Sequence, residues 1–459
     1  MSKILYKIKS LIPKRIFKIF QPFYHFIFAF FSACFYAFPS NKLIVIGVTG
    51  TTGKTTSVYL MAKVLNDIGI KTGYTSTAMF NDGEKEWLND KKMTMLGRMF
   101  TQRILKTMLK NNCRVAIIET TSEGIRQFRH RFINYDILVF TGLYPEHIES
   151  HGSFENYKKA KGKLFEHLKR CRPKYLNEEK KVIKIKNEIK KIDFYKVKKT
   201  IIVNGDDKYS SYFLSFWADE KIVYAQKKKE LKKEYKFLNY GNIENDDGIS
   251  FELEGEKVKL KLLGKFNATN VMNVFSLAYA LNIPQDIIKS KLKKIEGVPG
   301  RLEKINEGQN FLVIVDYAFE PGALTKLYET VQNISHKNII HVLGSAGGGR
   351  DMARRPILGQ LAGENADFVI ITNEDPYDED PEIIIDQVSL GAEKAGKQMG
   401  KNLFKILDRK EAIKKAIDLA REKDLILITG KGNEQAICVA DGKKIKWDDR
   451  EVVKELIKK

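Results

Sequence analysis

Residues 47–56 read Gly47-Val48-Thr49-Gly50-Thr51-Thr52-Gly53-Lys54-Thr55-Thr56. An apolar run, Leu43–Gly47, precedes this stretch, and a helix-like run from Thr55 to Asp67 follows it. A glycine-rich turn between a strand and a helix is typical of a phosphate loop, because its N–H groups and the helix N-terminus attract phosphate oxygens. Lys54 can then neutralise the β- and γ-phosphates of a nucleotide, and the hydroxyl of Thr55 can hold Mg²⁺. The usual pattern has glycine where this chain has Val48, so the loop is a variant.

The sequence around this loop indicates an α/β fold. Val115–Ile118 and Ile137–Phe140 are further apolar runs between helix-like stretches, the pattern of a parallel sheet with both faces covered. A second series has expected strands at Phe311–Val315, Ile339–Leu343, Phe368–Ile371, Leu403–Leu407 and Leu425–Ile428. We predict a basic, hydrophobic helical segment over residues 1–41. A parallel-sheet ATP-binding domain follows over 42–298, and a Rossmann-like α/β domain over 299–459.

Charge and cysteine content restrict the partners. The 79 Lys and Arg against 57 Asp and Glu give a net charge of +22, which favours anionic partners. The Lys-rich stretch from 169 to about 236 is predicted to be a solvated, peripheral part of the second domain. Nucleic acid is not an expected partner, because few aromatic residues lie among these lysines. The four cysteines are widely separated, which argues against a zinc site or disulfides and for a reducing cytoplasm.

The N-terminus is basic and then strongly aromatic. Residues 1–20 alternate lysines with Ile, Leu and Phe, and residues 23–38 are mostly Phe, Tyr and Ala. We do not interpret this segment as an export signal, because nucleotide chemistry belongs inside the cell. Two alternatives stay open: a helix lying on the cytoplasmic face of the inner membrane, or a helical hairpin packed onto the next domain.

The loop variant T-G-T-x-G-K-T-T, formed by residues 49–56, resembles that of the Mur ligases, and four further motifs resemble the same family in the same order. The chain is most similar to the type that adds the third residue of the peptidoglycan stem peptide. The resemblance covers Leu43 to the C-terminus. It implies that ATP and Mg²⁺ bind, with residues Gly50, Thr51, Thr52, Gly53, Lys54, Thr55 and Thr56 around the phosphates.

The resemblance also implies a metal and catalytic set. Glu119, which ends an expected strand, corresponds to a Mg²⁺ ligand, and Thr121 and Ser122 beside it are expected at the substrate. In the segment 140–165, His147 corresponds to the ligand of a second Mg²⁺ and Lys161 to the lysine that becomes carbamylated. Lys54, Glu119, His147 and Lys161 are therefore the expected catalytic residues, with Thr55 completing the metal set. Gly142, Glu146 and Glu123 depart from the family pattern.

Other motifs imply the nucleotide and amino-acid sites. Asn267 and Asn270 are expected in the adenine pocket, and Asn267 could at the same time cap a helix. Arg301 is expected at a phosphate and Asp316 at a ribose hydroxyl, while Phe319 replaces a family histidine. Residues expected at the incoming amino acid are Arg350, Asp375, Tyr377, Gly430 and Glu434. The diaminopimelate-adding members have Arg where this chain has Tyr377 and Asn where it has Asp375. This difference favours an amine-ended side chain, although the 430–434 turn is close to one that holds diaminopimelate, and the amino acid stays open.

We therefore predict an ATP-dependent ligase that adds diaminopimelate, lysine or a similar amino acid to UDP-N-acetylmuramoyl-L-alanyl-D-glutamate through an acyl phosphate. The enzyme is expected to be a cytoplasmic monomer, with peripheral membrane contact through residues 1–38. About forty residues precede the phosphate loop, and they do not resemble the UDP-binding domain found at this position in the family. The alternatives are a folylpolyglutamate or cyanophycin type of ligase, and a non-catalytic, membrane-associated nucleotide-binding protein.

Overall fold

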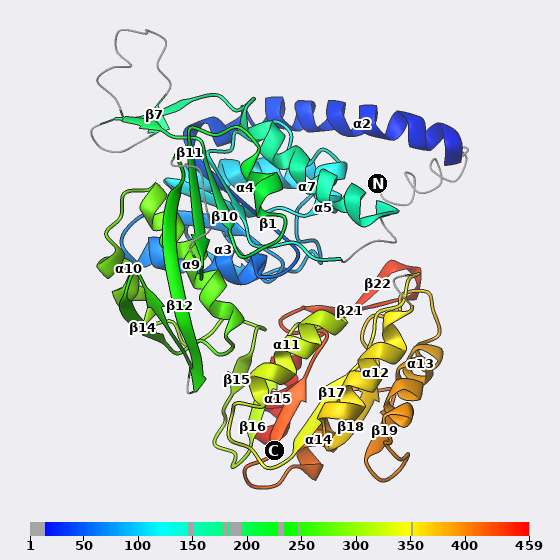
Figure 1. The fold of residues 1–459 in the computed structure, drawn as a ribbon. Coiled ribbons are helices and arrows are strands. Elements are labelled where there is room, and N and C mark those ends of the chain that lie inside the picture. The colour runs from blue at the N-terminus through cyan, green and yellow to red at the C-terminus, as the bar shows by residue number, and fades with distance from the viewer. Residues whose placement is uncertain are drawn as a thin grey trace.

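The computed structural model describes residues 14–145, 151–177, 182–183, 195–227, 234–246, 248–349 and 352–458. These residues form two lobes, each built on its own α/β sheet (Figure 1). The first lobe carries the phosphate loop, and the second begins near residue 300. The mixed α/β fold predicted from the sequence is confirmed.

The sheet of the first lobe places the phosphate loop at the centre of its parallel part. Strand β1 pairs in parallel with β5 on one side and with β6 on the other. Within the described residues the order is β14-β13-β12-β11-β10-β6-β1-β5-β2-β3-β4, and the pairs at both edges are antiparallel. The strands are β1 Ile44–Thr49, β2 Thr72–Thr75, β3 Met79–Asn81, β4 Glu86–Leu88, β5 Val115–Glu119, β6 Ile137–Phe140, β10 Thr200–Asn204, β11 Glu220–Ala225, β12 Lys236–Asp246, β13 Gly248–Leu253 and β14 Glu256–Leu260.

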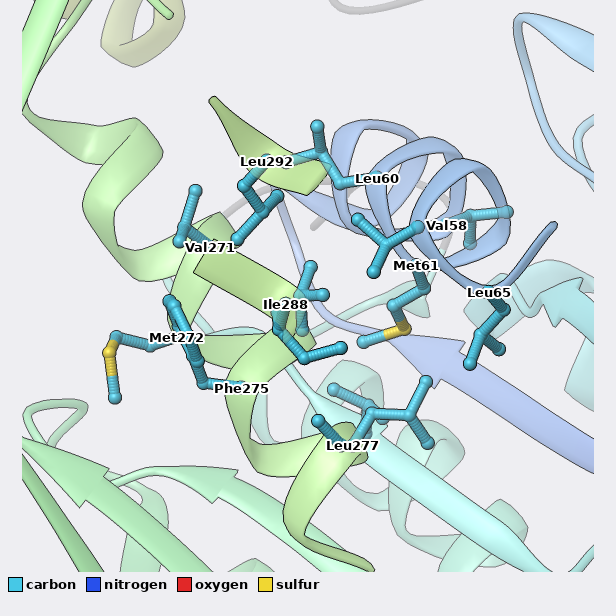
Figure 2. Close-up of a cluster of buried hydrophobic side chains, with 14 of the residues drawn as sticks. Val58, Leu60, Met61, Leu65, Val271, Met272, Phe275, Leu277, Ile288 and Leu292 are labelled. Carbon is cyan, nitrogen blue, oxygen red and sulfur yellow. The ribbon is translucent and has the colours of Figure 1, made fainter. Parts of the chain in front are cut away.

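Helices cover both faces of this sheet. Ile44, Ile46 and Val48 of β1 face one apolar cluster, and Val45 faces the other, as the alternation of a strand requires. The first cluster includes side chains of α3 (Lys54–Asp67), α9 (Phe266–Ala280) and α10 (Gln285–Leu292), which interdigitate in Figure 2. The second includes α4 (Arg98–Lys110), α5 (Ser122–Arg126), α7 (Phe154–Leu168) and α8 (Ser210–Leu214).

The second lobe repeats the architecture on a smaller scale. Its described strands follow the order β15-β16-β20-β17-β18-β19, all parallel except β15. They are β15 Glu303–Ile305, β16 Leu312–Val315, β17 Ile339–Leu343, β18 Phe368–Thr372, β19 Leu403–Ile406 and β20 Leu425–Ile428. Helices α11 (Pro321–Val331), α12 (Arg354–Asn365) and α13 (Pro381–Lys394) cover one face, and α14 (Arg409–Leu419) and α15 (Asp449–Ile457) cover the other.

Smaller elements complete the chain. Strands β7 (Lys174–Leu176), β8 (Val182–Ile183) and β9 (Tyr195–Val197) form an antiparallel sheet, and β21 (Ala436–Val439) pairs with β22 (Lys443–Lys446). Short 3₁₀ turns lie at Pro39–Lys42 and Ala440–Gly442.

The N-terminal segment is one helix, α2, over Lys14–Phe35, and it packs against α4. No turn interrupts it, so the helical-hairpin alternative is wrong for the described part of the segment. In Figure 1, α2 lies along the first lobe at the end away from the second lobe. Among the described residues, no helix combines the length and the apolar character needed to cross a bilayer.

The Lys-rich stretch differs from the prediction at two positions. Lys174 and Lys199 are buried, and both ammonium groups bind the buried carboxylate of Asp136. Lys174 also donates to the carbonyls of Leu43 and Asn134 at 2.6 Å. These two lysines therefore join β7 and β10 to the amino ends of β1 and β6 instead of facing solvent.

Candidate active site

The phosphate loop lies at the carboxyl edge of the first sheet, between β1 and α3. Gly53 precedes the helix with a φ of 78°, a left-handed conformation that favours glycine. A Cβ there would lie 2.4 Å from Oδ1 of Asn270, so α9 also excludes a side chain. The Nζ of Lys54 donates to the carbonyl of Thr51 at 2.7 Å, which folds the lysine back over its own loop. A phosphate in the loop would compete for this ammonium.

Residues that follow β6, and residues of α7, hold the loop through hydrogen bonds to its backbone. The N–H of Thr51 donates to the carbonyl of Gly142 at 2.8 Å, and the hydroxyl of Thr141 donates to the carbonyl of Thr52 at 2.6 Å. Lys161 of α7 is 2% exposed, and its Nζ donates to the carbonyl of Gly50 at 2.8 Å. The same Nζ lies 4.6 Å from the ring centre of Tyr157. The loop is thus bound to a buried lysine that the sequence places more than a hundred residues away.

Glu119 meets the phosphate loop directly. It ends β5 opposite Val48 of β1, and its side chain is 1% exposed. Its Oε2 accepts from the hydroxyl of Thr55 at 2.9 Å and from the N–H of Thr77 at 2.8 Å. A hydroxyl and a carboxylate at a phosphate loop are hard oxygen ligands that suit Mg²⁺. Among the described residues, no group of three or more His, Cys, Asp or Glu side chains is placed to hold a metal ion.

The segment after Glu119 forms a second polar group. Thr121 caps α5 by accepting from the N–H of Gly124 at 3.1 Å. Ser122 lies 3.1 Å from Nε2 of His151, which burial keeps at a lowered pKa. Two separate motifs therefore meet at Ser122. His147 lies outside the described residues, as does Glu146.

The expected adenine residues belong to a buried hydrogen-bond chain. The amide of Asn270 donates to Asn267 at 2.7 Å, and Asn267 donates to the carbonyl of Leu263 at 2.6 Å. Ser57 of α3 joins Asn270 to Asn273, which accepts from the hydroxyl of Tyr224. The N-cap of α9 is Lys265, so the suggestion that Asn267 caps this helix is wrong. The chain holds α9 against the start of α3 and hence against the loop.

Arg301 and Asp316 lie at the start of the second lobe. The guanidinium of Arg301 stacks 4.2 Å above the ring of Tyr317. Asp316 accepts from the N–H groups of Leu302 and Ala318 at 2.7 Å, and burial raises its pKa. Phe319 packs edge-on against Tyr317 and lies under the guanidinium of Arg354.

Four charged side chains form a group between the two lobes, which we call the ionic cluster: Lys92, Asp375, Lys431 and Glu434. Lys92 comes from the first lobe, between β4 and α4, and its side chain is 8% exposed. Its Nζ lies 2.8 Å from both carboxylate oxygens of Asp375 and 3.0 Å from Glu434. Lys431 binds Asp375 at 2.9 Å and Glu434 at 2.7 Å. Two cations therefore balance two anions inside the protein.

The cluster fixes its members' protonation. Burial alone would lower the pKa of Lys92, but the carboxylates of Glu434 and Asp375 raise that pKa above its usual range. Burial would likewise raise the pKa of Asp375, yet Lys431 and Lys92 hold it below its usual range. Asp375 also accepts from the N–H of Cys438 at 2.6 Å. Its charge is therefore already balanced, which weakens the argument that Asp375 by itself selects an amine-ended substrate.

The other residues expected at the amino acid border this cluster. The backbone of Tyr377 has a φ of 53°, and its N–H donates to the carbonyl of Cys438 at 3.1 Å. The ring of Tyr377 lies against Gly348, in the glycine-rich turn after β17. Gly430 has a φ of 98°, and a Cβ there would lie 2.4 Å from Oε2 of Glu374, whose pKa burial raises. Arg350 lies outside the described residues.

Three contributors were missed from the sequence: Thr77, Lys92 and Tyr157. Thr77 is the second partner of Glu119, and the hydroxyl of Tyr157 lies 3.2 Å from that of Thr51. Tyr157 stands in a recognised motif and could have been included. Thr77 and Lys92 carry no local signal, because their partners lie far away in the sequence.

Comparisons with known proteins identify relatives that match more than nine-tenths of the chain. Residues 48–199 match the Mur ligase middle domain, and residues 300–432 match the Mur ligase glutamate ligase domain. The chain is 34% identical to a UDP-N-acetylmuramyl-tripeptide synthetase of Roseiflexus over 91% of this chain and 79% of that protein. It is 33% identical to a UDP-N-acetylmuramoyl-L-alanyl-D-glutamate–2,6-diaminopimelate ligase of Halalkalibacterium halodurans, over 92% of this chain and 80% of the relative. A solved structure of a diaminopimelate ligase of the same name superposes with a TM-score of 0.57 at 26% identity, covering 91% of this chain and 78% of the other.

Proposed function

Because the chain belongs to the Mur ligase family, we propose that it joins an amino acid to UDP-N-acetylmuramoyl-L-alanyl-D-glutamate at the expense of ATP, in peptidoglycan precursor synthesis. It is an ATP-dependent ligase that forms an amide bond. The observation that carries the proposal is the meeting of Thr55 and Glu119 at a phosphate loop whose lysine, Lys54, folds over it.

The residues of the loop act on the nucleotide phosphates. The ammonium of Lys54 leaves the carbonyl of Thr51 for the transferring phosphate, and the N–H groups of residues 50–56 bind the neighbouring oxygens. Thr55 and Glu119 would hold Mg²⁺, and His147 is the proposed ligand of a second ion. Bound Mg²⁺ supplies positive charge that neutralises the phosphate oxygens.

The reaction has two steps. The acceptor carboxylate attacks the γ-phosphorus of ATP, ADP leaves, and an acyl phosphate forms. The amino group of the incoming amino acid then attacks the acyl carbon, phosphate leaves, and the nitrogen loses a proton. The protein contributes mainly by holding the reacting groups in line and by stabilising charge, since both displacements need alignment.

Lys161 is proposed to act as a carbamate. A neutral lysine amine adds to CO₂ and releases one proton, which leaves an N–H and a carboxylate at the end of the side chain. The remaining N–H can keep the hydrogen bond to the carbonyl of Gly50, while the new carboxylate can orient groups at the metal. This conversion replaces a buried cation, which would repel Mg²⁺, by an anion.

The rest of the nucleotide lies between the lobes in this proposal. Asn267 and Asn270 border the adenine, Arg301 contacts a phosphate and Asp316 accepts from a ribose hydroxyl. The support is that Asn270 touches Gly53 of the loop and that Asp316 and Arg301 begin the second lobe. Asn267, Asn270 and Asp316 each make buried or part-buried hydrogen bonds that hold their side chains in place.

The two substrates, the acceptor and the amino acid, are proposed to bind at residues other than those that border the nucleotide. Thr121 and Ser122 contact the acceptor, and Arg350, Asp375, Tyr377, Gly430 and Glu434 border the amino acid. The amino acid is diaminopimelate, lysine or a similar compound. We propose that the enzyme is a cytoplasmic monomer with peripheral contact to the inner membrane through residues 1–38.

Phosphate release tests the function. The purified chain is given ATP, Mg²⁺ and UDP-N-acetylmuramoyl-L-alanyl-D-glutamate with lysine, ornithine or diaminopimelate, and products are identified by mass spectrometry. We expect a tripeptide product with one amino acid, and phosphate release that requires both substrates. ATP binding without any product, across the whole panel, would contradict the proposed acceptor.

A further inference from the structure

Helix α2 presents a stripe of aromatic rings to solvent. Tyr24, Phe28, Phe31 and Phe35 follow one another at spacings of four, three and four residues, which places them on one face of the helix. Phe31 is 64% exposed and Phe35 is 75% exposed, and Phe23 beside the stripe is 65% exposed. Large apolar side chains gathered on one exposed face are uncommon on a protein that has no partner there.

The opposite face of α2 packs against the first lobe. Ala29, Ser32 and Ala33 are buried, and small side chains there allow the helix to lie close to the first lobe. Phe26 and Phe30 pack edge-on against Phe132, in the loop after α5. These contacts orient α2 with the Tyr24–Phe35 stripe facing away from the first lobe.

The charge of the sequence before and within α2 indicates which kind of partner the stripe fits. Residues 1–20 contain six Lys and Arg, and the chain has no acidic residue before Asp67. In the sequence, a segment whose charges are all positive thus precedes the exposed aromatic rings. This combination complements an anionic lipid bilayer, where aromatic rings enter the interface and basic residues meet the headgroups. A second copy of the same basic segment would instead be repelled.

We propose that the Tyr24–Phe35 stripe binds in the plane of an anionic bilayer and holds the acceptor side of the active site at the membrane surface. The binding of the stripe to the bilayer stands independently of the proposed function. The position of the acceptor side at the membrane surface rests on that function. Phe26, on the same helix, touches Phe128, which follows α5. The other end of α5 carries Ser122 and its partner His151. In this proposal helices α2 and α5 therefore lie between the bilayer and Ser122, a residue proposed to meet the acceptor.

Vesicle binding tests the anchor. The full chain is sedimented with phosphatidylcholine vesicles that contain or lack phosphatidylglycerol, at low and high salt. We expect binding to the anionic vesicles alone, with salt weakening it. A variant with Phe28→Ser, Phe31→Ser and Phe35→Ser should lose most of the binding, and one with Lys3→Gln, Lys7→Gln and Lys9→Gln should bind roughly a hundredfold more weakly.

A control variant removes three exposed apolar side chains elsewhere. Ile357, Ile383 and Leu390 are exposed on α12 and α13 in the second lobe, and their replacement by Ser should leave vesicle binding unchanged. Circular dichroism melts verify that each variant is folded. Equal binding to neutral vesicles, or full binding by the folded Phe variant, would overturn the proposal. So would a dimer in solution that the Phe substitutions dissociate, because a second copy would then be the partner.

Phosphate release without lipid separates the two ideas. Ligase activity of the soluble chain with no vesicle binding would overturn the anchor alone. Vesicle binding with no ligase activity on any amino acid would overturn the proposed function and the acceptor half of the proposal, and would leave the anchor standing.

Discussion

Lys92 and Asp375 join the two lobes: the Nζ of Lys92 lies 2.8 Å from each carboxylate oxygen of Asp375, across 283 residues of sequence. Lys92 also pairs with Glu434 of the second lobe at 3.0 Å, and the amide of Asn433 donates to the carbonyl of Ala78 in the first lobe at 2.9 Å. Asp375 and Glu434 border the proposed amino-acid site. The ammonium of Lys92 therefore contacts that site from the first lobe, so the site depends on how the two lobes are placed.

Lys92→Met should weaken amino-acid binding and leave ATP binding intact. The substitution keeps the length of the side chain but leaves the cluster with two carboxylates and one ammonium, so the lobes lose an attractive contact. Removing one partner of a buried charge pair costs about 2–5 kcal/mol in comparable interfaces, so we expect a rise of at least tenfold in the KM for the amino acid. Phosphate-release kinetics and ATP titration measure the two effects.

The neighbouring Lys91 supplies the control for that experiment. Its side chain is 39% exposed and pairs only with Asp90 among the described carboxylates. Lys91→Met should therefore change neither constant. An unchanged KM in Lys92→Met would show that the ionic cluster takes no part in amino-acid binding.

Glu119→Gln should abolish most of the activity while preserving the fold. The amide can still accept from Thr55 and Thr77, but it carries no charge and is a poor Mg²⁺ ligand. We expect turnover to fall by roughly a hundredfold or more and the Mg²⁺ requirement to rise. Glu166→Gln, on the exposed face of α7, serves as the control. Equal Mg²⁺ dependence in Glu119→Gln and the unmodified enzyme would rule Glu119 out as a ligand.

Lys161→Ala should be inactive, and a small carboxylic acid should restore part of its activity. The added acid can occupy the space of the lost side chain and supply the anion of the proposed carbamate. Activity of Lys161→Ala is measured with increasing acetate or formate, and Lys163→Ala on the exposed side of α7 is the control. Failure of every acid to restore activity, together with normal folding, would favour Lys161 acting as an ammonium that supports Gly50.

The sequence was sufficient where the signal was local. β6, β17 and β20 begin and end where apolar runs of the sequence begin and end, because buried parallel strands need apolar side chains on both faces. Glu119 was identifiable because it ends such a run, and parallel strands bring their carboxyl ends to one edge. The phosphate loop was identifiable because its glycines and Lys54 act over ten consecutive residues.

The sequence was insufficient where function depends on contacts between distant segments. Lys92 stands in the polar stretch Asn89-Asp90-Lys91-Lys92, which has the composition of an ordinary surface turn, and its partners belong to the other lobe. Lys174 and Lys199 stand in a Lys-rich stretch, where the prediction of a solvated face was wrong for these two. Their burial depends on Asp136, which no local pattern links to them.

The buried group around Asp136 makes stability depend on pH in a specific direction. Burial lowers the pKa of Lys174 to about 8, although Asp136 opposes the shift, and Lys199 adds to it. In the unfolded chain the pKa of this lysine returns to about 10.5. Between these two values the unfolded chain binds more protons than the folded one, so stability rises as pH increases through this window. Below about pH 8 both states are protonated and the contribution is flat.

Chemical unfolding of the unmodified chain and of Lys174→Met, at a series of pH values from 7 to 10, measures this effect. As pH rises above about 8, we expect the free energy of unfolding of the unmodified chain to increase relative to that of Lys174→Met. Asp136→Asn should be the more damaging change, by roughly 3–5 kcal/mol, because it leaves two buried ammonium groups facing each other without a counter-ion. Lys174→Met leaves Asp136 and Lys199 as a balanced pair. If the free energies of unfolding of Lys174→Met and of the unmodified chain changed in parallel with pH, Lys174 would have an ordinary pKa. If Asp136→Asn destabilised the chain less than Lys174→Met, the carboxylate would not balance the two lysines.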